Sequence, residues 1–271
     1  MSSNLGFVLA AALALALPRH ASATLFDDFE SYADQAAFQA AWPSWLPNGT
    51  SMDLVQGFGH SGVQSISGVA SAGDRRNYRN LDSFAAYRET DANPLEFELW
   101  LYDQDATLPA APDLAQNYCE VRAYEEDGMP PTWFTRGYHL QGLLDMGIYE
   151  SAGTQYGGGA GGRGHYAYHL YYGGLNAWYA TAARRTVGWH NMRMILSGAS
   201  ARIYVDGALD AEVPWANPNA LYPMDGVILG SGLTSAGYDV AFDDVRLDVV
   251  PDPMTVVLLA AGGSFRRRRR S

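Results

Sequence analysis

The sequence contains no lysine: all 18 basic residues of the 271-residue chain are arginine. This absence excludes Schiff-base chemistry, catalytic lysines and the phosphate-binding loops that require a lysine. Cys119 is the single cysteine, which excludes an internal disulfide framework and multi-cysteine zinc or iron–sulfur sites. Charged residues are scarce at 17%, whereas hydrophobic residues reach 48%. The composition therefore predicts a folded chain with a packed core.

The N-terminal segment is typical of a secretory signal peptide. Residues 5–17 form an apolar run, LGFVLAAALALAL, and residues 21–23 (Ala-Ser-Ala) provide a small-x-small cleavage site. The residues before the run lack the usual basic side chain, and the alternative interpretation is a buried N-terminal helix. We expect residues 1–23 to be a signal peptide and the protein to be exported.

The C-terminal segment combines a Pro-acid-Pro motif, a short apolar stretch and a basic cluster. The motif is Pro251, Asp252 and Pro253, and the cluster is Arg266, Arg267, Arg268, Arg269 and Arg270. This order resembles the PEP-CTERM sorting signal of bacteria that make exopolysaccharide, with Asp252 in place of the family's glutamate. The resemblance implies that an exosortase-type membrane protease reads residues 251–271 and that the protein is released or attached at the cell surface or in the extracellular matrix.

The physical properties of this tail indicate transient membrane contact. A helix of about 12 residues is roughly 18 Å long, shorter than a hydrocarbon core of about 30 Å. The arginines would stay on the cytoplasmic side. The alternative is a basic tail for nucleic acid. Residues 24–250 carry 12 arginines against 28 acidic residues, a formal charge of −16, which disfavours nucleic acid as a partner.

Residues 24–250 alternate β-rich segments with Gly, Asp, Asn and Pro breaks. Leu95–Tyr102 has the alternating pattern of a half-buried strand, and Asp206-Gly207 between two apolar runs predicts a hairpin. Only Ala33–Ala41 indicates a helix. Further strands are expected at Tyr118–Glu125, Leu143–Glu150, Tyr166–Tyr172, Trp189–Leu196, Ala201–Val205, Val227–Leu229 and Tyr238–Val249. The pattern predicts one all-β domain, a two-sheet antiparallel sandwich.

Three segments of this domain carry a second resemblance. They are Phe26–Tyr32 (FDDFESY), Gly59–Ile66 (GHSGVQSI) and Phe242–Leu247 (FDDVRL), with Gly188–Arg193 and Ile203–Gly207 between them. In this order they resemble the concanavalin A-like, or laminin-G-like, jelly-roll superfamily. The resemblance covers residues 24–250 and implies that the opening and closing strands are neighbours.

The same resemblance implies a structural calcium site. In calcium-bearing members an aspartate of the closing strand binds the ion together with carbonyl groups of the opening segments. Asp243 matches this position best, Gly62 is a candidate carbonyl donor, and Asp27, Asp28 and Asp244 are further candidate ligands. Oxygen ligands of these kinds suit Ca²⁺. The alternative is that these acids accept hydrogen bonds from the local backbone.

Aromatic residues gather near residues 166–179, where one strand face would form a stacking platform for sugar rings. The candidate carbohydrate-binding residues are Trp178, Tyr168, Tyr171 and His169. The alternative is that both faces are structural, because sandwiches use tyrosine heavily on half-buried strands. Trp100 and Trp189 lie inside expected strands and are assigned to the core.

Catalytic motifs of the superfamily are missing from the sequence. The E-x-D-x-x-E string of its retaining glucanases is absent, and Leu144–Glu150 lacks residues that its alginate-lyase relatives carry. Asp145, His139 and Tyr149 are candidates for acid–base chemistry. We interpret the protein as non-catalytic, with a carbohydrate-binding or structural role. The alternative is a polysaccharide-cleaving hydrolase or lyase on the same fold.

Overall fold

The computed structural model describes residues 24–45, 51–68, 75–81, 93–104, 116–124, 140–149, 164–231 and 240–250. The expected signal peptide, the sorting residues Pro251, Asp252, Pro253 and Arg266 to Arg268, and the candidate acid–base residue His139 lie outside these ranges. Among the described residues, no helix is both long and apolar enough to cross a membrane.

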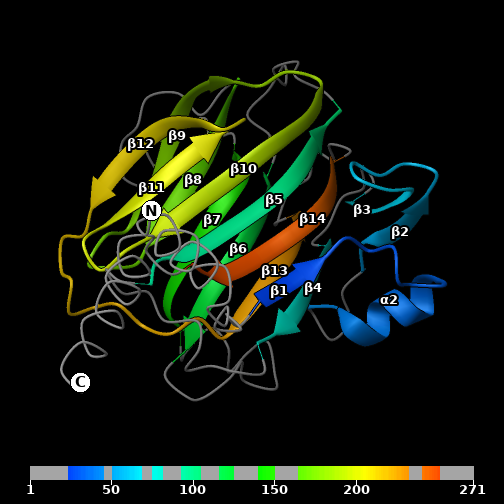
Figure 1. Cartoon of the computed structure of the whole chain (residues 1–271), viewed down its shortest axis with the longest axis horizontal. Helices are drawn as coiled ribbons and strands as arrows, with labels where there is room; N and C mark the ends of the chain where they lie inside the picture. Colours follow the sequence, from blue (N-terminus) through cyan, green and yellow to red (C-terminus); the bar gives the residue numbers. More distant parts are fainter. Residues whose placement is uncertain are drawn as a thin grey trace, which may run out of the picture.

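The described residues form two antiparallel sheets that pack face to face, as predicted (Figure 1). The eight-stranded sheet contains β1 (Thr24–Asp27), β2 (Asp53–Gln56), β3 (Gln64–Gly68), β5 (Leu95–Asp103), β10 (Gly188–Leu196), β11 (Ser200–Val205), β12 (Ala208–Pro214) and β14 (Val240–Val249). Its order is β12-β11-β10-β5-β14-β3-β2, with β1 paired to β14.

The six-stranded sheet contains β4 (Arg75–Asn80), β6 (Gln116–Tyr124), β7 (Leu140–Tyr149), β8 (His165–Tyr171), β9 (Ala177–Arg184) and β13 (Gly226–Ser231). Its order is β4-β13-β6-β7-β8-β9. The helix α2 (Gln35–Ala41) lies beside β2, within the predicted helical segment (Figure 1). Asp34 caps this helix by accepting a hydrogen bond from the Ala37 backbone N–H at 2.8 Å.

Side-chain alternation on β5 shows how the sequence selects the two faces of a sheet. Leu95, Phe97, Leu99 and Leu101 are buried between the sheets, and the intervening residues are only partly buried. Successive side chains of a strand point to opposite faces, so one face of β5 is core and the other is outer surface. Burial of such leucine and phenylalanine side chains contributes about 1.5–3 kcal/mol each.

Trp100 and Trp189 were expected in the core, and this expectation is wrong. Trp100 occupies an even-numbered, outward position of β5, and Trp189 lies opposite Tyr102 on the same outer face. His60 stacks on Trp100 with ring centroids 3.6 Å apart, and Phe58 stacks on Trp189 at 5.5 Å. Aromatic partners from the loop between β2 and β3 thus shield these indoles in place of the opposite sheet.

The predicted hairpin forms at Asp206 and Gly207, which join β11 to β12. Both residues have positive φ angles, 51° and 76°, as a type I′ turn requires. A right-handed strand twist is compatible with this turn, and Asp and Gly tolerate the left-handed region better than other residues. The tolerance of Asp and Gly for positive φ angles therefore explains both the sequence pattern and the observed turn.

The first and last strands are neighbours, as the resemblance implied. Asp27 of β1 lies opposite Val245 of β14. The pairing of β14 with β5 shifts between Asp243 and Arg246, and Asp244 has a φ of 49°. This irregularity is a bulge, which locally redirects the side chains of the closing strand.

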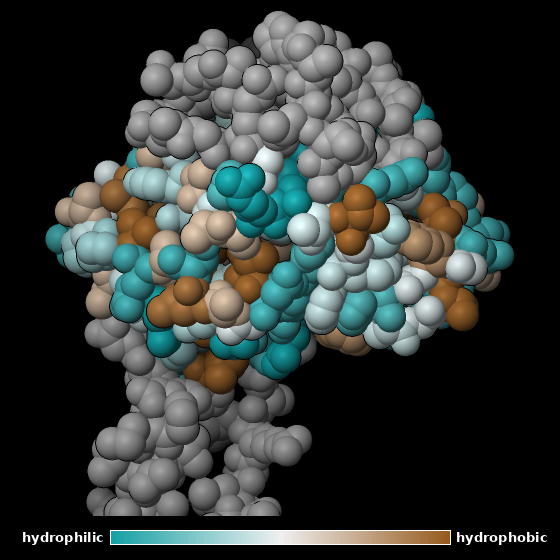
Figure 2. Space-filling view, turned by 90° about the horizontal axis from the view of Figure 1, so that it is seen from above, coloured by the Kyte–Doolittle hydropathy of each residue, from teal (hydrophilic) through white to brown (hydrophobic). Residues whose placement is uncertain are grey.

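Apolar groups on the outer surface are dispersed. In the view of Figure 2, hydrophobic residues form small groups between hydrophilic ones. The exposed large hydrophobic residues among those described are Phe26, Phe58, Val63, Val187 and Leu209. Isolated apolar side chains of this kind are ordinary on a protein surface.

Asp27 connects the N-terminal segment to both sheets. Its carboxylate accepts hydrogen bonds from the Tyr32 hydroxyl at 2.6 Å, the Trp42 indole N–H at 2.8 Å and the Arg79 guanidinium at 2.7 Å. The backbone N–H of Phe29 donates to the same carboxylate at 3.0 Å. Asp27 is 6% exposed, so its loss leaves several donors without an acceptor in a nearly dry site.

We expect Asp27→Ala to lower the free energy of unfolding by about 2–4 kcal/mol, because it breaks a buried charged network. Urea denaturation followed by tryptophan fluorescence measures this change. Asp53→Ala is the matched control: Asp53 pairs with Arg75 at 3.2 Å but its side chain is 52% exposed. The control should change stability by less than about 1 kcal/mol. Equal losses in the two variants would contradict the assignment of Asp27 as a structural anchor.

Candidate functional site

One row of side chains crosses the outer face of the six-stranded sheet. The strand register places its members directly opposite one another on consecutive strands, and directly opposed residues share a face. The row consists of Tyr78, Ile228, Glu120, Asp145, His169 and Trp178, in order from β4 to β9. It therefore changes from apolar to acidic to aromatic across the sheet.

The β4 side of this face is a small hydrophobic cluster. Trp45, Tyr124 and Ile228 are buried together, with Tyr78 packed against them. The guanidinium of Arg122 lies over the Trp45 ring, 4.5 Å from its centroid. This cation–π contact and the packing hold Arg122 in a fixed position beside the acidic part of the row.

The two acids at the centre of the row have different partners. Glu120 receives hydrogen bonds from Arg122 Nε at 2.6 Å and from Arg76 Nη1 at 3.2 Å. Asp145 Oδ2 contacts His169 Nδ1 at 2.8 Å, whereas Asp145 Oδ1 is buried without a hydrogen-bond partner. Asp145 is only 2% exposed. Glu120 is thus neutralised by arginine, and Asp145 retains a free acceptor.

The pKa of Asp145 is raised to about 6, because burial and the negative charge of Glu120 raise it more than the hydrogen bond from His169 lowers it. A carboxyl group with such a pKa changes protonation state near neutral pH. It is therefore able to accept or donate a proton under mild conditions.

Aromatic rings stack beside Asp145. Trp178 is nearly parallel to the His169 ring, with centroids 4.8 Å apart, and nearly parallel to the Tyr149 ring, with centroids 3.9 Å apart. Tyr149 belongs to β7 and Trp178 to β9. The small side chain of Ala167 on the intervening β8 is consistent with this approach. The stack fixes the orientation of His169 next to the free oxygen of Asp145.

The structure brings together part of the predicted carbohydrate-binding set. His169 and Trp178 are in contact, and Tyr171 lies on the same outer face, opposite Leu143. Tyr168 was also placed in this set, but its side chain points into the core and not to the outer face. It is 4% exposed, belongs to the core cluster and stacks on Tyr179 with ring centroids 5.1 Å apart. Residues 168 and 169 are adjacent on a strand, so they point to opposite faces.

The acid–base candidates Asp145 and Tyr149 flank the same aromatic stack. Glu120, Arg122 and Arg76 complete the surroundings and were not singled out from the sequence. A signal for two of them exists in β6, where Glu120 and Arg122 alternate with the buried residues Cys119, Val121 and Ala123. This alternation indicates an outward face but does not say which residues of other strands lie opposite.

The predicted calcium ligands occupy two different places. Asp243 lies opposite Trp100 on the outer face of the eight-stranded sheet, whereas Asp27 lies opposite the core residue Val245 and turns inward. Asp28 Oδ1 accepts a hydrogen bond from the Glu30 N–H at 3.2 Å. The Cα of Gly62 is so close to Glu30 that a side chain there would collide with the carboxylate.

Asp243 and Asp244 hold the loop between β2 and β3. Asp243 accepts hydrogen bonds from the backbone N–H groups of His60 at 2.6 Å and of Asp244 at 2.8 Å. Asp244 contacts the His60 ring at 2.7 Å and accepts a hydrogen bond from the Ser61 hydroxyl at 2.6 Å. The pKa of Asp243 is raised to about 6, because the effect of burial exceeds the opposing effect of the backbone hydrogen bonds.

The five predicted ligands do not all lie together, because Asp27 turns inward and Asp243 lies on the outer face. The oxygens of Asp243 face N–H donors, and a cation requires oxygen atoms that face it. Within the described ranges, no three His, Cys, Asp or Glu side chains are grouped to hold a metal ion. The resemblance predicts calcium binding by Asp243 and Asp244, whereas their hydrogen bonds indicate that they anchor the loop. The variant below distinguishes the two roles.

We expect Asp243→Ala to lower the melting temperature equally in calcium and in chelator, because His60 and Asp244 lose a buried acceptor in both conditions. A loss of about 2 kcal/mol corresponds to one or two buried donors left unpaired. Differential scanning calorimetry in each condition measures it, with Asp53→Ala as the control. A loss in calcium alone would show instead that Asp243 binds the ion.

Neither a family model nor a curated protein matches the sequence. Among solved structures, a carbohydrate esterase of the Shiga toxin-encoding bacteriophage phi24B has a TM-score of 0.50 and 12% identity, covering 78% of this chain and 90% of its own. An alginate lyase has a TM-score of 0.45 and 10% identity, covering 69% and 75%. The binding domain of botulinum neurotoxin serotype D has a TM-score of 0.48 and 10% identity, covering 78% and 44%. The likeness to the esterase shows a shared sandwich fold and no more.

Proposed function

We propose that the protein is an exported surface or matrix protein whose sandwich binds carbohydrate on the outer face of the six-stranded sheet. The site comprises Asp145, His169, Trp178 and Tyr149. One observation carries the proposal: the buried Oδ1 atom of Asp145 has no partner and lies beside a fixed stack of aromatic rings.

This combination of groups suits a sugar ring. A buried acceptor without a partner costs about 1–3 kcal/mol, and a ligand hydroxyl that donates to it recovers that energy. The C–H face of a pyranose is apolar and packs well against an aromatic ring. Trp178 is only partly buried, so the stack retains accessible surface. A ligand with hydroxyl donors around an apolar face satisfies both parts of the site.

A second candidate function is cleavage of the bound polysaccharide. It is favoured by the raised pKa of Asp145 and by its direct contact with His169, because a carboxyl group with this pKa is suited to acid–base chemistry. In this role Asp145 would be the acid–base residue and His169 would position its carboxyl group. The two candidates share one site and differ in whether a bond is broken.

Incubation of purified residues 24–250 with a panel of polysaccharides separates the two candidates. We expect retention on at least one glycan without new reducing or unsaturated ends. Trp178→Ala should weaken retention about tenfold, since it removes the stacking surface. Tyr204→Ala is the control, because Tyr204 packs against Arg193 on the other sheet.

Unchanged retention by Trp178→Ala would contradict the proposed site. Cleavage that disappears in Asp145→Asn would establish the enzymatic candidate. If neither retention nor cleavage is observed, both candidates are contradicted and a purely structural role is favoured.

Export and sorting form a separate part of the proposal. They are supported by the signal-peptide pattern of residues 1–23 and by the PEP-CTERM-like order of residues 251–271. Replacing Arg266 to Arg270 with serine should impair processing of the tail, because the cluster no longer holds the C-terminus on the cytoplasmic side. Immunoblotting of membrane and culture fractions measures the unprocessed form. Identical fractionation of variant and parent would count against a sorting role.

A further inference from the structure

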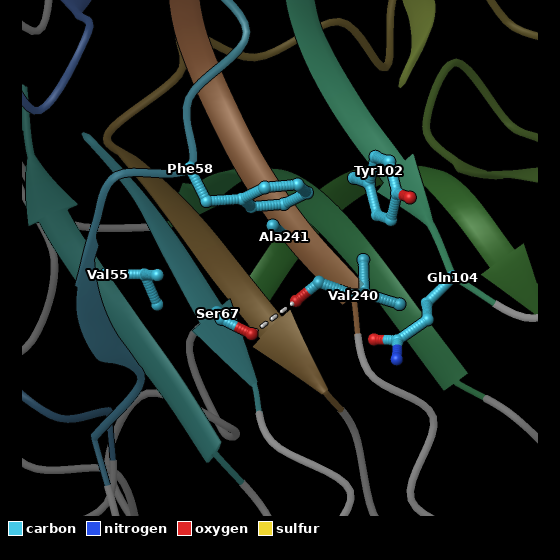
Figure 3. A pocket seen from close by; sticks show the side chains of 7 residues that line it. All are labelled: Val55, Phe58, Ser67, Tyr102, Gln104, Val240 and Ala241. Carbon is cyan, nitrogen blue, oxygen red and sulfur yellow. Dashed lines mark hydrogen bonds between the residues drawn. The ribbon is translucent and has the colours of Figure 1, made fainter. Parts of the chain in front are cut away.

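A pocket lies on the outer face of the eight-stranded sheet, the opposite side of the sandwich from the site proposed above. Its volume is about 350 Å³. Phe58 and Tyr102 form its aromatic side, and Val55 and Ala241 supply aliphatic surface (Figure 3). Val240 also lines the pocket, although its side chain belongs to the core cluster. The volume is at the lower end of the range for small-molecule sites.

The Phe58 ring is held in place from several directions. It meets Tyr102 edge-on with centroids 4.8 Å apart and stacks on Trp189 at 5.5 Å. The backbone N–H groups of Gly57 and Phe58 donate to the carbonyl of Val63 at 2.6 and 3.1 Å, which closes the loop. Phe58 is nevertheless 38% exposed. A ring that is both fixed and accessible offers a preformed stacking surface.

The loop that carries Phe58 is tied to the bulge of β14. Asp243 accepts a hydrogen bond from the His60 N–H, and Asp244 contacts both the His60 ring and the Ser61 hydroxyl. The His60 ring in turn stacks on Trp100. The two aspartates therefore fix the backbone directly after Phe58. Such preorganisation reduces the entropy cost of binding.

The polar groups of the pocket are all uncharged. Ser67 and Gln104 line it beside the Tyr102 side chain (Figure 3). The Ser67 hydroxyl donates to the Val240 carbonyl at 3.1 Å, and its oxygen still has acceptor capacity. Gln104 is exposed and offers both a donor and an acceptor. The neighbouring Asp103 points into the core, where Arg185 binds it at 2.8 Å.

We propose that this pocket binds a neutral pyranose ring of a glycan. The aromatic side matches the apolar face of the ring, and the amide and hydroxyl groups match its hydroxyls. A lining without cations gives no compensation for a carboxylate or sulfate, so the pocket selects uncharged sugars. The site is independent of the one at Asp145, which lies on the other sheet.

The test uses saturation-transfer NMR with three neutral disaccharides, cellobiose, maltose and lactose, and with glucuronic acid as the charged probe. The full chain carrying Trp178→Ala serves as the starting protein, so that binding at the first site is about tenfold weaker. We expect saturation of the pyranose C–H protons for at least one neutral sugar and weaker binding of glucuronic acid.

Phe58→Ala should then raise the dissociation constant about tenfold. Val63→Ala is the matched control, since Val63 is 61% exposed on the same loop and does not line the pocket. Gln104 is exposed, so Gln104→Ala leaves the fold unaffected. This variant should raise the dissociation constant about threefold. Circular dichroism confirms folding of each variant.

Three results would overturn the inference: no saturation transfer to any neutral sugar, equal affinity of Phe58→Ala and Val63→Ala, or tighter binding of glucuronic acid. The Phe58 and Val63 variants leave the Asp145 site unchanged, because its residues lie on the other sheet. Failure of one proposal is therefore distinguishable from failure of the other.

Discussion

The alternation of side chains along β5 determines the arrangement of this sandwich. β5 lies between β10 and β14 at the centre of the eight-stranded sheet. Its odd-numbered side chains point into the core, so its even-numbered side chains point to the outer face. The paired strands must follow the same division, because directly opposed residues share a face. Trp100 and Tyr102 are therefore surface residues that need partners other than the opposite sheet.

The division of side chains between a core face and an outer face costs more free energy on the six-stranded sheet, because charged groups on its outer face are buried. Glu120 is compensated by Arg122 and Arg76, as a buried carboxylate must be. Asp145 receives only the contact from His169, and burial shifts its pKa upward. The incomplete satisfaction of Asp145 is the feature on which the proposed carbohydrate site rests.

The bulge of β14 connects the fold to the second outer face. The register shift between Asp243 and Arg246 allows two successive acidic residues to reach one loop, and Asp tolerates the positive φ that this requires. A regular strand would place neighbouring side chains on opposite faces. The loop fixed in this way supplies Phe58 and His60, which cover Trp189 and Trp100. The bulge of β14 therefore accounts both for the anchoring of the loop and for the shielding of Trp100 and Trp189.

The sequence by itself determined most of the strands, the Asp206-Gly207 hairpin, the short helix and the pairing of the opening with the closing strand, because these follow from local patterns and from a resemblance carried by those strands. It did not predict β2, β4 and β9. It also identified His169, Trp178, Asp145 and Tyr149 without relating them to Glu120. Tertiary structure decided the inward position of Tyr168, the separation of Asp27 from Asp243 and the row from Glu120 to Trp178. These features depend on the register between strands that are distant in sequence, and a shift of one residue reverses the face of every side chain.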